Sequence, residues 1–430
     1  MRRSLCCGTR PWPALLLFAT LSGCQQSQGS DSGIQQLRSS VAHDATPDAT
    51  DDQYAAFIAA HNAFAIDLLQ QLMPQDQNYV FSPTSAYLTL GMAYVGASGV
   101  TAEEMRTVLH DDLPPGVFHQ AANRLMSDLQ ASNADTFKQA DGDKFVRVAL
   151  ADGIWADQTL PINSVFLDLL SAQYDAGVYQ ADFVAAAENA RADINSWVAD
   201  KTSDNIRNLF LPGMVGPTTR WVLVNALAVN ASWQTAFDSS LSEITPFSDL
   251  SGARIDVSTL KGPMDVRFYG TAEMVVLELP MVLQNLSMTF LVPLTGQFAT
   301  VRERLGAVIA NQELAQLSPQ RFTVTLPQFS VHNSSVSLRD GLVALGMQYS
   351  FSDSADFSNI TGQAGLNIGD LVQQSAVGVD ASGVLTNLAT SPQDPGSPAA
   401  AFAVDRPFFF MIRNAWGAIL LAGQVVNPNQ

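Results

Sequence analysis

The sequence predicts an α+β domain in which the helices come first and the strands of a large sheet follow. Apolar residues recur at helical spacing in the first half of the chain, whereas the second half carries short apolar runs rich in β-branched and aromatic residues. From residue 53 to residue 430 no polar linker interrupts the apolar pattern. Helices followed by antiparallel-looking strands are typical of α+β folds, and we expect one domain without internal repeats.

Three helices are predicted in the first half of the chain, over residues 55–72, 101–109 and 186–201. In the first of them, Phe57, Phe64 and Leu68 recur at helical spacing. The second begins with Thr101 and Glu104, which have the spacing of a capping box. The third places one aromatic and two aliphatic side chains on a single face, which indicates packing against a core.

Six strands are predicted from apolar runs that are enriched in β-branched or aromatic residues. These runs cover residues 221–229, 274–279, 287–294, 322–326, 408–413 and 417–426. Their concentration after the helical segments indicates a large sheet formed mainly by the second half of the chain.

The N-terminus is a targeting segment, which we assign to residues 1–23 as a signal peptide. Arg2 and Arg3 begin a basic region, and residues 13–21 form an apolar stretch that is too short to span a bilayer. The sequence Leu-Ser-Gly-Cys that ends at Cys24 resembles a bacterial lipobox, which implies cleavage before Cys24 and a lipid on its thiol. The alternative is an ordinary signal peptide with an incidental cysteine.

Residues 24–52 are expected to be a disordered tether between the lipid and the folded domain at 53–430. They are rich in Gln, Ser, Asp and Thr and contain almost no large apolar residue. Gln25 differs from the aspartate that resembles an inner-membrane retention signal. We therefore expect an outer-membrane lipoprotein of the cell envelope, anchored through its lipid and extracytoplasmic.

Cysteine content and charge exclude several kinds of site and partner. Cys6 and Cys7 leave with the signal peptide, so the mature body has no thiol beyond Cys24 and cannot form an internal disulfide. Without the signal peptide, 19 basic residues stand against 40 acidic ones, for a net charge of −21. Such a surface is a poor partner for nucleic acid and for other polyanions, including glycosaminoglycans.

No catalytic motif is present, so we expect neither an enzyme nor a bound metal or cofactor. The sequence lacks a G-x-S-x-G elbow, a P-loop and an H-E-x-x-H motif. Its five histidines are scattered, and we expect them to be solvated or locally hydrogen-bonded rather than catalytic: His43, His61, His110, His119 and His332.

The most unusual segment covers residues 379–402 and joins two strongly apolar runs. Its first half has the character of a strand, whereas its second half carries Pro392, Pro395 and Pro398 and many small residues. Long connections without secondary structure are uncommon inside compact domains and usually have a function. We expect an exposed loop.

A series of short motifs extends along most of the chain. They are Tyr79–Ser85, Leu90–Ala97, Thr101–Glu104, Ile194–Val198, Leu223–Ala226, Leu326–Phe329, Leu345–Met347, Ala355–Ser358, Ile360–Gly362, Asp405–Phe410 and Gly423–Pro428. Their residue types alone would fit the core or turns of any fold. In this order and spacing they resemble the serpins, the serine-protease-inhibitor superfamily, over residues 54–428.

The resemblance implies a large central, mostly antiparallel sheet with two smaller sheets, about nine helices and an exposed reactive loop. It also implies a serine-type endopeptidase inhibitor that needs no catalytic residue of its own. In this family a protease cleaves the loop as a substrate and forms an acyl-enzyme. The freed loop then inserts into the central sheet as an extra strand, which distorts and traps the protease.

The resemblance also assigns two groups of site residues. The hinge of the reactive loop comprises Gly383, Val384, Thr386 and Leu388, in a stretch where inhibitory serpins carry mostly alanine. The gate region beneath the hinge comprises Ser82, Ser85, Asn225, Gln373 and Trp233. Gln373 stands where the family has a histidine, and its amide can still donate and accept hydrogen bonds.

The position of the reactive bond stays open between neighbouring residues. Counting forward from Gly383 places it after Ser397, whereas counting back from Pro407 places it after Gly396. Cleavage can also shift past the proline that follows, so the candidates are Gly396, Ser397, Pro398 and Ala399. These residues are small or lack charge, which favours a serine or cysteine protease of elastase-like or subtilisin-like preference over a trypsin-like one.

Two residues of the loop oppose full insertion. Because strand residues alternate between faces, Pro392 and Asp394 share the face of Val384, which insertion buries. A proline inside a strand removes a ladder donor, at a cost of about 3 kcal/mol by analogy with helices, and a carboxylate removed from water is also costly. The alternatives are therefore a monomeric inhibitor, a non-inhibitory serpin whose loop is a plain substrate, or a carrier with an internal ligand pocket.

Overall fold

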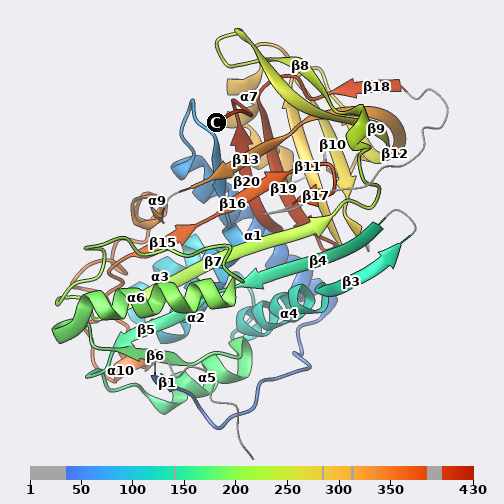
Figure 1. The fold of residues 1–430 in the computed structure, drawn as a ribbon. Coiled ribbons are helices and arrows are strands. Elements are labelled where there is room, and N and C mark those ends of the chain that lie inside the picture. The colour runs from blue at the N-terminus through green and yellow to red at the C-terminus, as the bar shows by residue number, and fades with distance from the viewer. Residues whose placement is uncertain (1–34, 140–141, 283–284, 311–313, 334, 385–399) are drawn as a thin grey trace, which may run out of the picture. The chain divides into compact units, whose positions relative to one another are not determined.

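The computed structural model describes residues 35–139, 142–282, 285–310, 314–333, 335–384 and 400–430. Within these residues the chain forms ten α-helices and twenty strands (Figure 1), which confirms the predicted α+β class. The strands build an eleven-stranded and a nine-stranded sheet. The two smaller sheets expected beside the central one are thus joined into a single nine-stranded sheet.

The helices concentrate in the first half of the chain, as predicted. They are α1 (Asp51–Leu72), α2 (Pro83–Gly96), α3 (Gly99–Val108), α4 (Val117–Ala131), α5 (Ser164–Tyr174), α6 (Phe183–Lys201), α7 (Phe298–Glu303), α8 (Leu305–Ala310), α9 (Arg339–Leu345) and α10 (Ser358–Thr361).

The eleven-stranded sheet follows the order β1-β6-β5-β7-β17-β16-β13, and β3, β4, β14 and β15 branch from this path. Its strands are β1 (Gln35–Leu37), β3 (Ala134–Gln139), β4 (Gly142–Leu150), β5 (Gly153–Asp157), β6 (Val178–Ala181), β7 (Trp221–Ser232), β13 (Phe329–His332), β14 (Val336–Ser337), β15 (Leu371–Gln374), β16 (Ala376–Val379) and β17 (Gly383–Val384).

The nine-stranded sheet follows the order β18-β12-β9-β10-β11-β19-β20-β2, with β8 paired to β9. Its strands are β2 (Tyr79–Phe81), β8 (Glu243–Ser248), β9 (Arg254–Gly270), β10 (Met274–Pro280), β11 (Leu286–Pro293), β12 (Ser318–Pro327), β18 (Ala400–Ala403), β19 (Phe408–Asn414) and β20 (Ile419–Val425). All six strands predicted from apolar runs are present, with ends shifted by a few residues.

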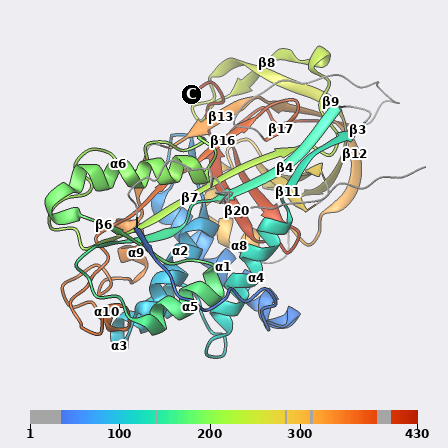
Figure 2. The same ribbon diagram turned by 60° about the horizontal axis from the view of Figure 1, so that its bottom comes forward.

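Strand β7 is buried on both faces, which explains its continuous apolar sequence. Leu223 and Leu227 belong to the main core, whereas Val222 and Val224 belong to a second cluster beneath α6. Figure 1 and Figure 2 show α6 crossing one face of β7 and α1 and α2 behind the other face. Since strand side chains alternate, Asn225 shares the face of Leu223 and Leu227, toward α2.

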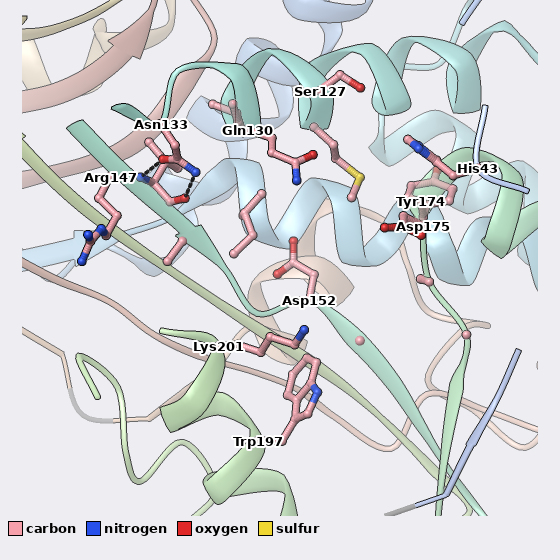
Figure 3. Close-up of a pocket in the computed structure, with 18 of the residues that line it drawn as sticks. His43, Ser127, Gln130, Asn133, Arg147, Asp152, Tyr174, Asp175, Trp197 and Lys201 are labelled. Carbon is pink, nitrogen blue, oxygen red and sulfur yellow. Dashed lines mark hydrogen bonds between the residues drawn. The ribbon is translucent and has the colours of Figure 1, made fainter. Parts of the chain in front are cut away.

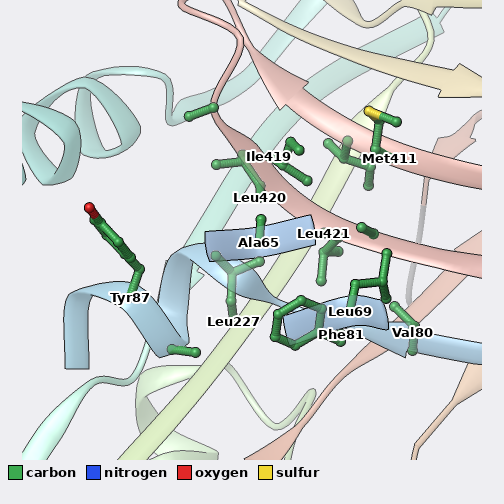
Figure 4. Packing of buried hydrophobic residues seen from close by; sticks show 14 of the residues in the cluster. Ala65, Leu69, Val80, Phe81, Tyr87, Leu227, Met411, Ile419, Leu420 and Leu421 are labelled. Atoms are coloured by element: carbon green, nitrogen blue, oxygen red, sulfur yellow. The ribbon is translucent and has the colours of Figure 1, made fainter. Parts of the chain in front are cut away.

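Helix α2 is apolar around almost its whole circumference because it lies between the two sheets. It packs on α1, on β7 of one sheet and on β20 of the other, as the packing in Figure 4 shows. Tyr87, Leu88 and Leu90 are fully or almost fully buried. At Gly96 an added Cβ would lie 2.2 Å from the side chain of Ile360, so this helix end fits only glycine. The helix therefore couples the two sheets mechanically.

All three predicted helices begin earlier than expected, and α6 starts at Phe183 instead of residue 186. Helix α1 starts at Asp51 because Thr50 and Gln53 form a capping box that the apolar pattern did not indicate. Helix α3 starts at Gly99, and the capping box predicted at Thr101 and Glu104 is wrong. Thr101 Oγ1 accepts instead from the amide of Asp356, at 2.9 Å. The carboxylate of Glu104 accepts from the amides of Tyr349 and Ser350. Both side chains therefore bond the segment between α9 and α10, and these tertiary contacts replace the local cap.

Residues 35–50, which were expected to belong to the disordered tether, lie along the folded domain. Strand β1 pairs antiparallel with β6, and the carbonyl of Leu37 lies so close to Gly177 that a Cβ there would clash. His43 bonds Asn123, and the amide of Asp44 donates to the carbonyl of Ala172 at 2.9 Å. Composition indicated disorder, but backbone pairing at a sheet edge fixes this segment.

Truncation of Leu421 is expected to lower the free energy of unfolding by about 2–5 kcal/mol, because it leaves a cavity between helices and sheet. Leu421 is fully buried beside Leu69 in Figure 4. Urea unfolding of Leu421→Ala, followed by circular dichroism, measures the change. Leu250→Ala is the control, since Leu250 is 41% exposed and its loss should cost less than about 0.5 kcal/mol. Equal losses for both variants would contradict the packing described.

Candidate functional site

The candidate site is a seam in the eleven-stranded sheet, where β7 meets β15 and β17. Along its first half β7 pairs in parallel with β15, with Leu371 opposite Leu223 and Gln373 opposite Asn225. Along its second half β7 pairs with the two-residue strand β17. Strand β7 therefore pairs directly with β15 in its first half, whereas in its second half Gly383 and Val384 lie between β7 and β16.

The first two hinge residues already form a strand in the sheet. Gly383 pairs with Ser232 and Val384 pairs with Ala231 of β7, while Val384 also pairs with β16. Both residues are buried. A Cβ on Gly383 would lie 2.1 Å from the carbonyl oxygen of Ala231, so only glycine allows this close approach. These two hinge residues therefore lie in the sheet beside the C-terminal end of β7.

A tight turn ahead of β17 holds the hinge in place. The carboxylate of Asp380 accepts from the amides of Ser382 and Gly383, at 2.7 and 3.1 Å. Trp233 binds the same turn twice: its indole N–H donates to the carbonyl of Asp380 at 3.0 Å, and its amide donates to the carbonyl of Ser382 at 2.8 Å. The fully buried Trp233 therefore supports the hinge directly and does more than fill the core.

Gln373 of β15 connects this strand to β7 and to the N-terminus of α2 at the centre of the seam. Its side-chain amide donates to Asn225 Oδ1 at 2.7 Å and to the carbonyl of Ser82 at 2.8 Å. Its Oε1 accepts from the amide of Ser82 at 2.9 Å. All three residues are buried. The glutamine thus uses both ends of its amide to join β15 to β7 and to the residue that caps α2.

Ser82 and Ser85 hold the N-terminus of α2 beneath the seam. Ser82 caps the helix, and its hydroxyl donates to the carbonyl of Leu420 in β20 at 2.9 Å. The hydroxyl of Ser85 donates to Asp152 Oδ1 at 2.5 Å. The structure therefore brings together Ser82, Ser85, Asn225 and Gln373, as the resemblance implied, and adds Asp152.

Asp152 is a partner of Ser85 that the sequence interpretation missed. It lies in the short break between β4 and β5, and burial raises the pKa of its carboxyl to about 8 despite the hydrogen bond from Ser85. Its Oδ2 is buried without a hydrogen-bond partner in the described part of the chain. The sequence offered only an acidic residue followed by a glycine, a pair that usually marks an exposed turn.

A cavity of about 680 Å³ opens beside Asp152 (Figure 3). Asp152, Trp197 and Lys201 line one side of it, and Asn133 and Tyr174 are further lining residues. Figure 3 shows the carboxyl of Asp152 directed into this space and Lys201 reaching toward it from α6. Water or a small solute can therefore reach the vicinity of the gate from the side of the sheet.

The two ends of the reactive loop are attached to different sheets. Its beginning, at Val384, pairs with β7 and β16, whereas Ala400 begins β18 and pairs in parallel with Phe322 of β12. The loop therefore bridges the eleven-stranded and the nine-stranded sheet. The other predicted site residues lie outside the described residues: Cys24, Thr386, Leu388, Pro392, Asp394, Gly396, Ser397, Pro398 and Ala399.

Among the described residues no three His, Cys, Asp or Glu side chains converge as metal ligands. The histidines have local partners; His61 and His119 are enclosed, and burial lowers the pKa of each to about 4. None of the helices described is both long enough and apolar enough to cross a membrane.

Replacement of Gln373 by alanine is expected to lower the free energy of unfolding by about 1–3 kcal/mol, because Asn225 and the amide of Ser82 lose their buried partner. Thermal and urea unfolding of Gln373→Ala measure this loss. Gln320→Ala, on the exposed part of β12, is the matched control and should behave as the unmodified protein does. A Gln373→Ala protein as stable as the control would show that the gate bonds do not hold the seam.

Comparisons with known proteins agree with this architecture. A family model described as "Serpin (serine protease inhibitor)" matches residues 59–428. Iripin-4 of Ixodes ricinus is 32% identical over 381 residues, which cover 85% of this chain and 93% of that protein. Ovalbumin of Dromaius novaehollandiae is 28% identical over 390 residues, which cover 86% of this chain and 99% of that protein.

A solved structure gives the same result. Serpin48 of the insect Tenebrio molitor matches with a TM-score of 0.76 at 28% identity, over 88% of this chain and 99% of that one. The family match covers most of the chain. The chain belongs to the serpin family.

Proposed function

We propose that this serpin inhibits serine-type endopeptidases as a suicide substrate, through cleavage and insertion of its reactive loop. Serpins are not enzymes, and most of them inhibit proteases. The observation that supports the proposal best is the pairing of Gly383 and Val384 between β7 and β16. The strand that the mechanism must lengthen has already begun in the uncleaved chain.

The two attachments of the loop suit this reaction. Attack of the protease nucleophile on the scissile carbonyl forms an acyl ester with the part of the loop that continues from Val384. The part that begins the other side of the bond leaves with a free amine and stays bound through β18. Extension of β17 between β7 and β15 then carries the acyl end along the seam, and the new backbone hydrogen bonds and buried side chains drive it.

The burial of Val384 defines which loop residues insertion would enclose. Val384 is fully buried and belongs to the main core. Because strand residues alternate, Thr386 and Leu388 would follow onto the same face, and both suit a buried strand. Pro392 and Asp394 would follow onto it as well. Insertion therefore begins favourably and meets its obstruction in the second half of the loop.

The second candidate function is a non-inhibitory serpin, and the obstruction at Pro392 and Asp394 favours it. Ovalbumin is a family member that does not inhibit proteases. In that case the loop would be cleaved as a plain substrate, or not at all, and the chain would act by binding. The two functions differ in whether cleavage leads to insertion.

We propose further that the target is an extracytoplasmic protease of elastase-like or subtilisin-like preference, because Gly396, Ser397 and Ala399 are small. The protein would meet it as a monomer held to the outer membrane through a lipid on Cys24. The support for this location is the lipobox-like sequence at the N-terminus.

Incubation with an elastase and with a subtilisin should give a complex that survives denaturing electrophoresis. The double variant Pro392→Ala, Asp394→Ala should give a several-fold higher fraction of complex, because it removes an obstruction of about 3 kcal/mol or more. Densitometry of the complex and of the cleaved product measures the partition.

Gln393→Ala is the matched control, since residue 393 lies on the opposite strand face and its replacement should leave the partition unchanged. Cleavage of every variant without a complex, and without a rise in melting temperature after cleavage, would exclude insertion. That result would favour the non-inhibitory alternative.

A further inference from the structure

Helix α2 bridges the two sides of the seam through two different side chains. Ser82 is bonded to Gln373 of β15, which lies on one side of the seam. Ser85 is bonded to Asp152, which lies on the other side, because the flanking strands β4 and β5 both pair with β7. The two serines lie about one helical turn apart on the same helix.

Insertion of a strand must break at least one of these contacts. One added strand widens a sheet by about 4.8 Å. An α-helix cannot lengthen by that amount between Ser82 and Ser85 without losing its own hydrogen bonds. Opening of the seam therefore separates Ser82 from Gln373 or Ser85 from Asp152, in addition to breaking the direct bond between Gln373 and Asn225.

We propose that Asp152 is the titratable residue of the gate and that its ionisation favours opening of the seam, so that strand insertion is faster in alkaline than in acidic solution. The inference rests on the proposed function, because it describes how that same insertion step is regulated. Its structural basis is the position of the carboxyl between Ser85 and the cavity at the edge of the closed seam.

The charged surroundings of Asp152 come mainly from the walls of the cavity. Its titratable lining groups are His43, Arg147 of β4, Tyr174 of α5, Asp175, Tyr179 of β6 and Lys201 of α6. Within the described part of the chain none of them forms an ion pair with Asp152, and α2 presents the uncharged Ser85 and Thr89 to it. Lys201, the cation that reaches toward the carboxyl, is exposed, so water screens its charge.

The direction of the effect follows from proton binding. In the closed seam burial raises the pKa of Asp152 to about 8, and Oδ2 is buried although the carboxyl points toward the cavity. Where opening separates Ser85 of α2 from Asp152, water from the cavity reaches the carboxyl, and its pKa returns toward the ordinary value near 3.8. Between these two values the closed form binds more protons than the open form. A rise in pH through this window therefore shifts the equilibrium toward opening, and the effect levels off above pH 8.

The test measures entry of a strand without any protease. A labelled peptide with the sequence of residues 385–394, carrying alanine in place of Pro392 and Asp394, is incubated with the full chain at pH 5.5, 7.0 and 8.5. Native electrophoresis follows its incorporation. We expect the rate to rise at least about tenfold between pH 5.5 and pH 8.5 in the unmodified protein, and less than twofold in Asp152→Asn.

Asp111→Asn is the matched control. Asp111 is also buried, and burial also raises its pKa, but it lies beyond α3 and does not touch the gate. This variant should keep the full pH response. A flat profile in the unmodified protein, or an undiminished response in Asp152→Asn, would overturn the proposal.

A second measurement decides the question if the peptide does not enter at any pH. Hydrogen exchange of the backbone amides of β15, Leu371–Gln374, whose pairing with β7 closes the seam, reports its opening directly. After correction for the intrinsic effect of pH, exchange should accelerate toward alkaline pH in the unmodified protein and not in Asp152→Asn. Because no protease takes part, failed inhibition with a pH-dependent seam would refute only the proposed function, and inhibition with a pH-independent seam only this inference.

Discussion

The short parallel pairing of β15 with β7 is the interaction on which the rest of the structure depends. It extends over only four residues, between Leu371 and Gln374, and parallel ladders are slightly less stable per residue than antiparallel ones. On one side of it β7 is held over nine residue pairs, five with β4 and four with β5, and on the other side β16 pairs with β13 over four; all of these ladders are antiparallel. The seam is therefore closed by a short ladder of the less stable kind.

The buried polar groups concentrate along this line. Gln373, Asn225, Ser82 and Ser85 satisfy one another, whereas Asn225 Nδ2 and Asp152 Oδ2 lack partners in the described part of the molecule. A buried polar group without a partner raises the free energy of the closed state. An apolar seam of the same shape would hold the strands together more firmly. These polar contacts thus fix the register between β7 and β15, but they stabilise the closed seam less than apolar contacts would.

Much of the fold could be predicted from sequence because its signals are local or ordered along the chain. Apolar periodicity located α1, α3, α6 and all six predicted strands but missed α4 and α5, and the order of short motifs led to Gln373 and Asn225. The roles of Asp152 and Thr101 could not be predicted, because each bonds a partner that is distant in sequence. The contact of residues 35–50 with the domain could not be predicted for a similar reason, because their polar composition does not indicate that residues 35–37 pair with β6.

Strand β1 covers an edge of the eleven-stranded sheet that would otherwise be open to pairing with other chains. A sheet that can accept a strand in its interior is also a template for strands of neighbouring molecules, and an unpaired edge invites such association. Here the edge at β6 is occupied by the chain's own Gln35–Leu37. That new edge is only three residues long and carries two glutamines, so it offers a short and polar template. The chain thereby covers one edge of its own sheet and leaves a shorter, more polar one in its place.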